Sequence, residues 1–477
     1  MRRLRAKEFR SGRCAAAFVA LFAMLVASCA AADERRLNVL LVVIDDLRPE
    51  LHTYGVWDVQ TPNIDTLAAL GTRFNNAYCQ YPVCNPSRSS FLTGKRPDEL
   101  GIYSNRVSLR KEHPDLVTLP QAFRDAGYRT AGLGKLFHQG LDEHGKQTLF
   151  RDDLSFEHGY RALGASPAIG RQGEGRRLGD GSIPWCQWLA AEGGDAAQPD
   201  GMLADEAVRV LEEVGDDPFF VAVGFHKPHD PFIAPREYFA PYKTAAIKLP
   251  TPPEDRSPLA RFAIPKSYDF TKFSDTDRRE FKRAYHACVS FVDAQVGKLW
   301  RCLDRLKLWD DTIVVLMGDH GYHLGEHGWW NKVTIFELGA RTPLIVWVPG
   351  AGGMGQDSDT VVELLDLYPT LVDYCGIEPP HTLSGEALRP LLDGKPSASG
   401  SRAAYTQVTR GGIGMGYSVR TDRFRFTQWG KEGEGGLELY RHPADRDEYR
   451  NLADLPEHAS DVERLTELLR DGFPSLR

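Results

Sequence analysis

The amino-acid sequence predicts an α/β protein: a large mixed, mostly parallel sheet flanked by helices, followed by a small C-terminal antiparallel sheet with one helix. Three observations predict this fold. Continuous apolar runs recur along the chain, helical patterns lie between them, and short strands separated by turns follow after about residue 380. Near-continuous apolar runs are typical of strands that helices cover on both faces.

The predicted strands of the large sheet share a high content of Val, Leu and Ile. They cover residues 38–44, 128–133, 219–224, 312–317 and 344–348. The polar residues that follow the first four of these runs are Asp45, Asp46, Lys135, His138, His226, His229, Asp319 and His320. Ligands of open α/β sheets bind beyond the carboxyl ends of the strands. The sequence therefore predicts a functional site at this edge of the sheet.

Helical periodicity appears between these strands, at residues 63–70, 119–126, 201–214 and 278–306. Residues 140–200 and 230–275 are rich in Gly, Pro and charged residues, which predicts long excursions above the sheet. Later in the chain, short strands are expected at 403–408, 416–420, 424–429 and 437–440, and a final helix at 461–469. We therefore expect a main domain over residues 33–380 and a smaller α+β subdomain over 381–477.

Residues 1–32 have the composition of an export signal. Basic residues precede an apolar run at 15–27, which is too short to span a bilayer. Two endings fit the pattern: a lipobox-like segment, which would place a lipid on Cys29, or a small-residue cleavage site at 30–32. We expect an exported protein that is periplasmic, secreted or a cell-surface lipoprotein, with membrane contact only through Cys29.

The rest of the chain is acidic. The full sequence has a net charge of −7, and residues 1–32 contribute +5, so the remainder carries about −12. This charge argues against nonspecific nucleic-acid binding, and an anionic substrate would need local cations or a metal. Cysteines are sparse and no pair has zinc-finger spacing.

Cys84 lies in a stretch with an unusual local pattern. Cys84-Asn-Pro-Ser-Arg88 is followed, after a helical segment, by Thr93-Gly-Lys-Arg-Pro97. This pattern resembles the signature of the formylglycine-dependent sulfatases of the alkaline phosphatase-like superfamily. The resemblance implies a sulfatase whose Cys84 is oxidised to formylglycine by a separate maturation enzyme. A buried or disulfide-bonded thiol is the alternative, and it leaves Pro86 and Arg88 without a role.

The implied modification has a chemical reason. A hydrated aldehyde carries two hydroxyl groups on one carbon, so one can attack sulfur and the other can expel sulfate by restoring the aldehyde. A serine would leave a stable sulfate ester. A helix that starts at position 84 would also favour negative charge on these oxygens.

Asp45, Asp46 and Asp319 are candidate metal ligands. Carboxylates are hard oxygen donors, which suit calcium or magnesium better than zinc. A solvated turn is the alternative for either polar doublet alone, but two doublets follow two buried strands. The resemblance implies one calcium ion, with His320 and the modified Cys84 contributing to its site.

Further motifs of the resemblance are Gly134-Lys-Leu-Phe-His138, His226-Lys-Pro-His229 and the lysine at 332. It implies that Lys135 holds the formylglycine and sulfate oxygens and that His138 assists sulfate elimination. His229 would protonate the leaving oxygen, and Lys332 would grip the sulfate. Arg88 would steady the nucleophile and the metal ligands. Histidine suits proton transfer because its pKa is near neutrality.

Other histidines of these motifs have plainer interpretations. His226 is expected to be structural or to support the site residues. His323 and His327 have i, i+4 spacing, but their order is not that of a zinc-binding His-Glu-x-x-His helix. We expect them to shape a loop beside the site.

Within the family, residues 46–49, 220–232 and 319–328 resemble the branch that acts on 2-O-sulfated uronates. The resemblance covers most of the chain but not 140–200, where sugar-binding loops are expected. A sulfated carbohydrate is therefore the implied substrate, with the uronate as its finer form. The residues we predict to contact a sugar or its carboxylate are Arg48, Tyr103, Trp329 and Trp330.

Two other functions fit parts of the sequence. A phosphate or phosphonate monoester hydrolase of the same fold would share the Cys84 motif, but nothing in the sequence suggests a second metal. A noncatalytic glycan-binding protein would be expected to lose at least one candidate residue, such as Cys84, Arg88 or Lys332, and all are present.

Overall fold

A computed structural model describes residues 36–141, 147–149, 152–157, 172–397, 400 and 402–477. The predicted export signal at 1–32, with Cys29, lies outside these residues. Residues 38–477 form one compact unit. Within the described part of the chain, no helix combines the length and the apolar character that a membrane crossing requires.

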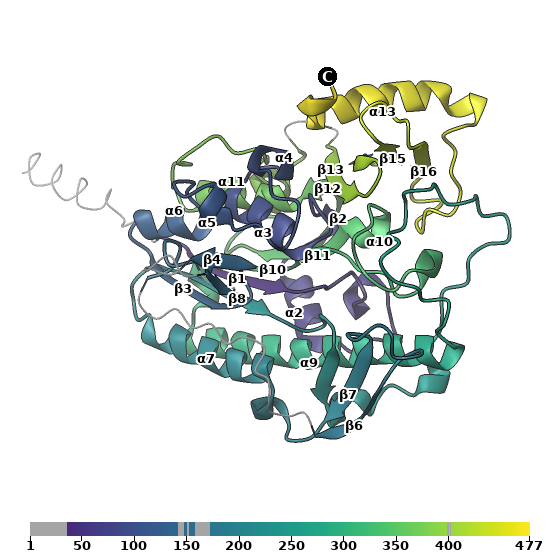
Figure 1. Ribbon diagram of the computed structural model, residues 1–477. Coiled ribbons are helices and arrows are strands. Elements are labelled where there is room, and N and C mark those ends of the chain that lie inside the picture. Colours follow the sequence, from purple (N-terminus) through teal and green to yellow (C-terminus); the bar gives the residue numbers. More distant parts are fainter. Residues whose placement is uncertain (1–35, 142–146, 150–151, 158–171, 398–399, 401) are drawn as a thin grey trace, which may run out of the picture. The chain divides into compact units, whose positions relative to one another are not determined.

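The central sheet contains β1 (Asn38–Ile44), β2 (Thr72–Tyr78), β3 (Arg129–Gly134), β8 (Phe219–Phe225), β10 (Thr312–Gly318), β11 (Arg341–Trp347) and β12 (Gln356–Glu363). Their order across the sheet is β12-β2-β11-β10-β1-β8-β3 (Figure 1). β1 is parallel to both β10 and β8, and β3 is parallel to β8. Only β11 runs against its described neighbours, β10 and β2. This arrangement confirms the predicted α/β class with a mixed, mostly parallel sheet.

Helices cover both faces of this sheet (Figure 1). One face carries α2 (Pro62–Leu70), α7 (Pro199–Glu213) and the long α9 (Asp275–Leu306), and α9 contacts both of the others. The other carries α3 (Cys84–Thr93), α6 (Leu119–Asp125) and α11 (Leu367–Tyr374). β1, β8 and β10 are buried along their whole length because they are covered from both sides. The sheet is therefore a rigid base for whatever lies at its edges.

A second sheet follows near the C-terminus. Its strands are β13 (Ala404–Arg410), β14 (Gly414–Arg420), β15 (Phe424–Trp429) and β16 (Leu437–Arg441), paired antiparallel in that order. The amphipathic α13 (Ala459–Gly472) buries Leu465 and Leu469 against it. These elements match the predicted small sheet with one helix. The predicted domain boundary near residue 380 stays a prediction.

Two parts of the fold were not predicted from the sequence. β2 and β12 were missed because β2 contains Arg73, Asn75 and Asn76, and β12 is a largely exposed edge strand. The presumed excursions also contain a small sheet of β6 (Gly173–Arg177), β7 (Gln187–Ala191) and β9 (Phe232–Pro235).

The remaining described elements are short. They are the strands β4 (Gln139–Leu141) and β5 (Gln147–Leu149), the helices α4 (Pro97–Leu100), α5 (Leu109–Glu112), α8 (Arg236–Phe239), α10 (Glu337–Ala340) and α12 (Arg389–Leu392), and the 3₁₀ turns η1 (His52–Tyr54), η2 (Asp195–Ala197), η3 (Thr244–Ala246), η4 (Trp309–Asp311), η5 (Glu326–Gly328), η6 (Leu364–Asp366), η7 (Pro456–His458) and η8 (Pro474–Leu476).

Candidate active site

The carboxyl ends of β1, β3, β8 and β10 and the start of α3 meet at one edge of the central sheet. Parallel register is what brings these ends together, because each strand delivers its following residue to the same edge. The structure gathers there Asp45, Asp46, Arg88, Lys135, His229, Asp319, His320 and Lys332 around Cys84. His138 lies near enough for its pKa to respond to Lys135 and Asp45.

Cys84 is the first residue of α3 and is fully buried. Its Sγ lies 3.3 Å from Lys332 Nζ, 3.4 Å from His320 Nε2 and 3.5 Å from Lys135 Nζ. Burial, followed by the nearby Asp45 carboxylate, raises the pKa of the thiol to about 12. An unmodified thiol at this position is therefore protonated at neutral pH and is a weak nucleophile.

Arg88 connects the two polar doublets. Its Nε donates to Asp319 Oδ2 at 2.9 Å, and a terminal nitrogen donates to Asp45 Oδ1 at 3.1 Å. Its other terminal nitrogen donates to the carbonyl groups of Lys135 and Leu136. The side chain is completely buried, so the guanidinium group fixes both carboxylates and the segment that carries Lys135.

Asp46 has a positive φ of 62°, a conformation that Asp tolerates better than most residues. Its backbone N–H donates to Asp319 Oδ1 at 3.0 Å, and its Oδ1 accepts from Lys332 Nζ at 2.5 Å. Its Oδ2 is buried and accepts no hydrogen bond. An ionised oxygen without a donor is costly in a protein interior unless a cation is nearby.

The Nε2 atom of His320 faces the carboxylates of Asp46 and Asp319. Its Nδ1 lies 2.9 Å from the carbonyl oxygen of Gly321, which can only accept, so Nδ1 carries the hydrogen. In the neutral ring, Nε2 then offers a lone pair, 3.4 Å from Asp46 Oδ1 and 3.6 Å from Asp319 Oδ2. A lone pair facing two carboxylate oxygens is repulsive unless a proton or a metal ion lies between them.

These donors fit a metal ion. Atoms of Asp45, Cys84, Asp319 and His320 lie within 4.8 Å of one another, as do atoms of Asp45, Asp46, Cys84 and His229. The set is rich in carboxylate oxygen, which suits a hard divalent cation. The unpaired oxygen of Asp46 and the orientation of His320 support the same conclusion.

The ionisable groups of the site stabilise one another's charges. Burial opposes charge on Asp45, but nearby cations, led by Lys135, lower its pKa well below the ordinary value. Burial also opposes charge on Lys332, yet Asp46 leads the groups that raise its pKa well above the ordinary value. Burial, by contrast, raises the pKa of Asp319. Three cations face three carboxyl groups, and a divalent metal ion would leave an excess of positive charge that suits an anionic substrate.

The surroundings lower the pKa of two candidate catalytic histidines, His229 and His138. Burial, then Lys332, lowers the pKa of His229 well below its ordinary value, and burial, then Lys135, lowers that of His138 to about 3. His226 Nδ1 lies 3.8 Å from Asp45 Oδ2, so its predicted supporting role agrees with its position. His323 Nε2 is hydrogen-bonded to Thr334 Oγ1, and His327 Nε2 donates to the Asp447 carbonyl oxygen.

Sequence reasoning missed two acidic residues that shape this site. Asp200, in α7, accepts the backbone N–H groups of His226 and Lys227 at 2.9 and 2.8 Å and so fixes the loop that carries His229. Asp230 is adjacent to His229, and burial raises its pKa to about 7. Asp200 has no motif around it, whereas Asp230 directly follows the His226–His229 motif and could have been found there.

The predicted sugar contacts are wrong for three residues. Trp329 and Trp330 are each only 3% exposed and pack in the main hydrophobic core. Arg48 is also buried, and Glu50 and Glu326 pair with its guanidinium group. None of the three presents a free surface to a sugar. Tyr103 is half-buried and donates to Asp98 Oδ1 at 2.9 Å, and its proposed contact stays a prediction.

Comparison with known families agrees with this geometry. Residues 37–377 match the Sulfatase family, and residues 325–472 match the family "N-sulphoglucosamine sulphohydrolase, C-terminal". The chain belongs to the sulfatase family and is a sulfuric ester hydrolase. The recognition of this family from the Cys84 motif is thereby confirmed.

The chain is also similar to individual curated proteins and solved structures. Iduronate 2-sulfatase from Mus musculus is 32% identical, over 82% of this chain and 84% of the relative. Among solved structures, the phosphonate monoester hydrolase of Agrobacterium radiobacter has a TM-score of 0.75 and 23% identity, covering 93% of this chain and 96% of the other. A 2-O GAG sulfatase has a TM-score of 0.72 and 22% identity, covering 92% of each chain. Both solved structures show a shared fold.

Proposed function

We propose that this sulfatase hydrolyses sulfate esters of sugars, in particular 2-O-sulfated uronates, using formylglycine derived from Cys84 and one calcium ion. The observation that carries the proposal is the position of Cys84, whose Sγ lies 3.3 to 3.5 Å from two lysine nitrogens and one histidine nitrogen. An anion bonded at this position would meet positive charge on two sides. The similarity to iduronate 2-sulfatase supports the choice of sugar.

Two groups that the chain would hold supply part of the chemistry. Asp45, Asp46, Asp319 and His320 would bind the calcium ion, which contributes fixed positive charge beside the reacting ester. Hydrated formylglycine at position 84 supplies two hydroxyl groups on one carbon, for covalent capture and release of sulfate.

The chain's own side chains position the ester and handle the protons. Lys135 and Lys332 would each donate hydrogen bonds to sulfate oxygens, because their Nζ atoms flank Cys84 Sγ. His229 Nδ1 lies 2.6 Å from the Asp230 carbonyl oxygen, so Nε2 carries a proton only when the ring is cationic. A bound sulfate ester would stabilise that cation, and Nε2 could then protonate the leaving alcohol oxygen.

The first test is mass spectrometry of the peptide that contains Cys84, from protein made in its native host or with a maturation enzyme. The same preparation is assayed for sulfate release from sugars sulfated at the 2-, 4- and 6-positions. We expect an aldehyde at position 84 and a preference for the 2-sulfated uronate. An unmodified thiol in active protein would contradict the nucleophile, and a preference for another ester would contradict the sugar.

Cys84→Ala tests the same assignment by mutation. Loss of the covalent nucleophile should lower kcat/KM by at least about 10⁴-fold, while substrate binding is partly retained. Sulfate release by the variant at the parental rate would overturn the mechanism. Because a phosphonate monoester hydrolase shares the fold, a phosphonate monoester is included in the assays. Faster turnover of that ester than of any sulfated sugar would favour phosphonate hydrolysis instead.

A further inference from the structure

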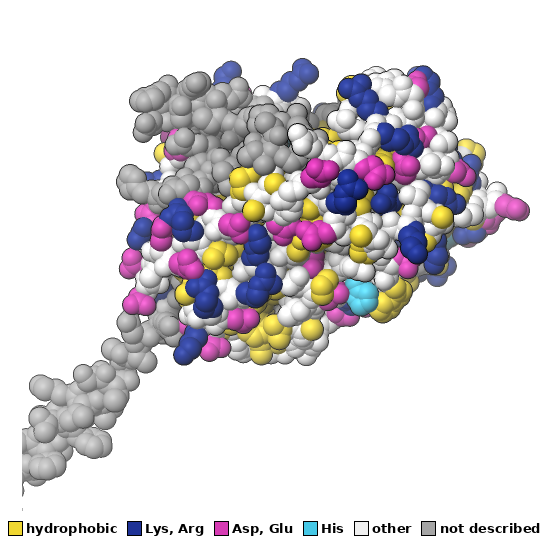
Figure 2. All heavy atoms as spheres, turned by 90° about the horizontal axis from the view of Figure 1, so that it is seen from below, with side chains coloured by type: hydrophobic (Ala, Val, Ile, Leu, Met, Phe, Trp, Pro, Cys, Tyr) yellow, Lys and Arg dark blue, Asp and Glu magenta, His cyan; other side chains and the backbone are white. Residues whose placement is uncertain are grey.

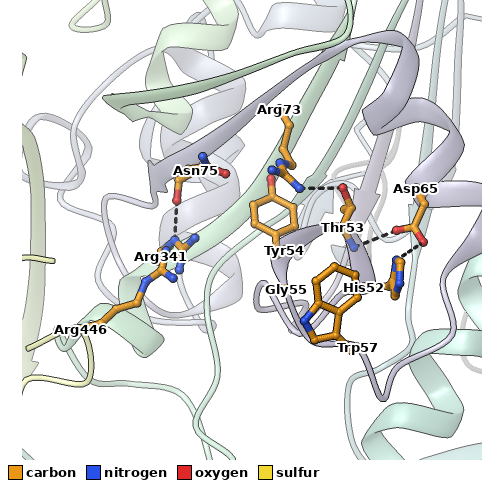
Figure 3. Close-up of a pocket in the computed structure, with 10 residues that line it drawn as sticks. All are labelled: His52, Thr53, Tyr54, Gly55, Trp57, Asp65, Arg73, Asn75, Arg341 and Arg446. Carbon is orange, nitrogen blue, oxygen red and sulfur yellow. Dashed lines mark hydrogen bonds and ion pairs between the residues drawn. The ribbon is translucent and has the colours of Figure 1, made fainter. Parts of the chain in front are cut away.

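A cavity of about 580 Å³ opens between η1, the strands β2 and β11, and the segment after β16 (Figure 3). We call it the Trp57–Arg446 pocket, after two of the residues that line it. No residue that we assign to catalysis or metal binding is among the described residues that line it. Its volume lies within the range of about 300 to 1,000 Å³ that is common for small-molecule sites.

Positive charge dominates the lining of this pocket. Arg73, Arg341 and Arg446 contribute guanidinium groups, and Asp65 is the one acidic residue among the described residues of the lining. The Asp65 carboxylate is already engaged, because it accepts from the Thr53 N–H at 3.0 Å and lies 2.9 Å from His52 Nδ1. Outside the lining, Asp357 pairs with Arg73 and Glu337 lies 3.8 Å from Arg341 Nε. Arg446 has no acidic partner among the described residues, so the pocket keeps positive charge that its own acid does not neutralise.

Two of the guanidinium groups keep free donors. Arg341 donates through Nε to the Asn75 carbonyl oxygen at 2.6 Å, but neither of its terminal nitrogens donates to a described residue. Arg446 is exposed and makes no hydrogen bond or ion pair with the described part of the chain. Figure 3 shows the two side chains reaching the same part of the pocket. Arg341, and then burial, lowers the pKa of Arg446, as expected for two like charges without an anion between them.

Aromatic rings form another part of the lining. Trp57 is 75% exposed, the largest exposed fraction among the exposed large hydrophobic residues of the described chain. Tyr54 is fixed by hydrogen bonds to the carbonyl oxygens of Phe74 and Leu344 at 3.1 and 3.2 Å, and Arg73 lies over its ring. A fixed ring and an open indole beside guanidinium groups that keep free N–H donors offer both an apolar surface and anion donors.

The positive charge at this pocket is local on an acidic chain. The face drawn in Figure 2 mixes basic and acidic side chains without a broad region of one sign, and the chain as a whole is acidic. Three arginines around one cavity of an acidic protein form a local positive region, which would attract an anion. Arginine forks fit carboxylate and sulfate oxygens in pairs, which neutral sugars do not supply.

We propose that the Trp57–Arg446 pocket is a second binding site for an acidic sugar of a glycan chain, which it holds without taking part in hydrolysis. The sugar ring would lie against Trp57, and its carboxylate or sulfate would be bound by Arg341 and Arg446. The glycan nature of the ligand rests on the proposed function, whereas the anion site follows from the pocket itself.

The proposal is tested by calorimetric titration of full-length Cys84→Ala protein, which avoids turnover. The probes are a sulfated, uronate-containing hexasaccharide, a neutral hexasaccharide and inorganic sulfate. In the Cys84→Ala protein we expect two binding sites for the hexasaccharide. Adding Arg446→Gln or Trp57→Ala should remove the second site or weaken its affinity at least about tenfold. Arg470→Gln removes one charge from an exposed arginine that pairs with Glu467 on its own helix, and should keep both sites.

Several outcomes would overturn the proposal. One site in the parent protein, or two unchanged sites in both variants, would remove the pocket as a binding site. Equal affinity for inorganic sulfate, with no effect of Trp57→Ala, would leave a simple anion site and exclude the sugar. If the hexasaccharide occupies both sites but the active enzyme does not desulfate it, the proposed substrate is wrong, whereas the proposed binding site in the pocket is supported.

A kinetic comparison with active enzyme gives an independent check. Arg446→Gln should raise KM for a sulfated glycan chain that is long enough to occupy both sites at once. It should leave hydrolysis of a small aryl sulfate unchanged, because the small ester does not depend on the second site. An equal loss on both substrates would show that the substitution acts on the reaction centre, which contradicts the proposal.

Discussion

Two buried clusters of charged residues in this protein look alike in composition but differ in how their hydrogen-bonding atoms are used. The first surrounds Cys84 at the edge of the central sheet. The second lies where α10 meets the C-terminal sheet, and we call it the junction cluster. Its members are Glu337, Arg420, Arg425, His442 and Glu448.

In the junction cluster every carboxylate oxygen has a donor. Glu337 accepts from the Tyr78 hydroxyl at 3.0 Å and from Arg425 at 2.9 Å. Glu448 accepts from Arg425 at 2.7 Å and from the Glu337 backbone N–H at 2.6 Å, and His442 Nε2 lies 2.9 Å from the same carboxylate. Although these side chains include enough donors for a metal, no carboxylate oxygen is left to bind one.

The cluster around Cys84 keeps binding capacity unused. Asp46 Oδ2 is buried without a donor. His320 Nε2, which lies 3.4 Å from Cys84 Sγ, also faces the carboxylates of Asp46 and Asp319. Unsatisfied polar atoms in an otherwise well-packed interior indicate a place where a ligand completes the structure. The difference teaches that residue types alone do not identify a metal site, whereas the pattern of unmet hydrogen bonds does.

The largest expected effects come from removing one carboxylate charge from each cluster. Asp46→Asn should lose bound metal and lower kcat/KM by at least about 10²-fold, because a metal contributes several kcal/mol to stabilising the reacting ester. Glu448→Gln is the matched substitution and should retain metal and turnover. Both variants are assayed for sulfate release, and metal per chain is measured after gel filtration in calcium buffer.

The same two variants can also contradict the difference that we infer between the two clusters. Full metal content and activity in Asp46→Asn would show that the unpaired oxygen is not a ligand. Metal loss in Glu448→Gln would show that the junction cluster, and not the edge of the sheet, holds the ion.

Arg425→Met tests the junction cluster, and we expect it to lower the free energy of unfolding. Arg425 is fully buried between Glu337 and Glu448. Its removal leaves Glu448 without its arginine and Glu337 with Arg420 as its nearest remaining cation, and should cost about 3 to 5 kcal/mol. Chemical unfolding curves measure this loss, and Arg470→Gln on the surface should change stability by less than about 0.5 kcal/mol. Turnover of the folded variant at low temperature should stay at the parental level. A selective loss of turnover without destabilisation would place Arg425 in the chemistry.

The sequence predicts the first cluster much better than the second. Asp45, Asp46, Asp319 and His320 follow continuous apolar strands, so strand direction alone places them at one edge. Glu337 and Glu448 are 111 positions apart and have no motif around them. Their meeting depends on how the C-terminal sheet packs, which local patterns do not encode.

Local sequence patterns also did not predict which individual side chains are buried. Trp329 and Trp330 were expected to contact a sugar, yet both pack in the core. Trp57 had no motif and is the open aromatic residue of the second pocket. Similarly, β12 is a polar edge strand whose assignment depends on its pairing with β2. Side-chain exposure is thus decided by tertiary packing, not by sequence position.

The smallest expected effect is the pH dependence of the junction cluster. Burial alone would raise the pKa of Glu337, but Arg420, His442 and Arg425 lower it below the ordinary value. An unfolded chain regains the ordinary pKa of about 4.3. As the pH falls below that value, the unfolded state binds a proton that the folded state excludes, so the stability contributed by Glu337 is full above it and is lost toward the lower folded pKa.

Glu337→Gln isolates this contribution because Gln does not titrate. Above about pH 5.5 the stability difference between parent and variant should be constant, and below about pH 4.5 it should shrink by up to about 1.4 kcal/mol per pH unit. Urea midpoints at a series of pH values measure it. The carboxylates around Cys84 titrate in both proteins and cancel in the difference, so the measurement reports on the junction cluster alone. Parallel stability curves would mean that Glu337 does not stabilise the fold through its charge, and the two clusters would then differ less than their hydrogen bonds indicate.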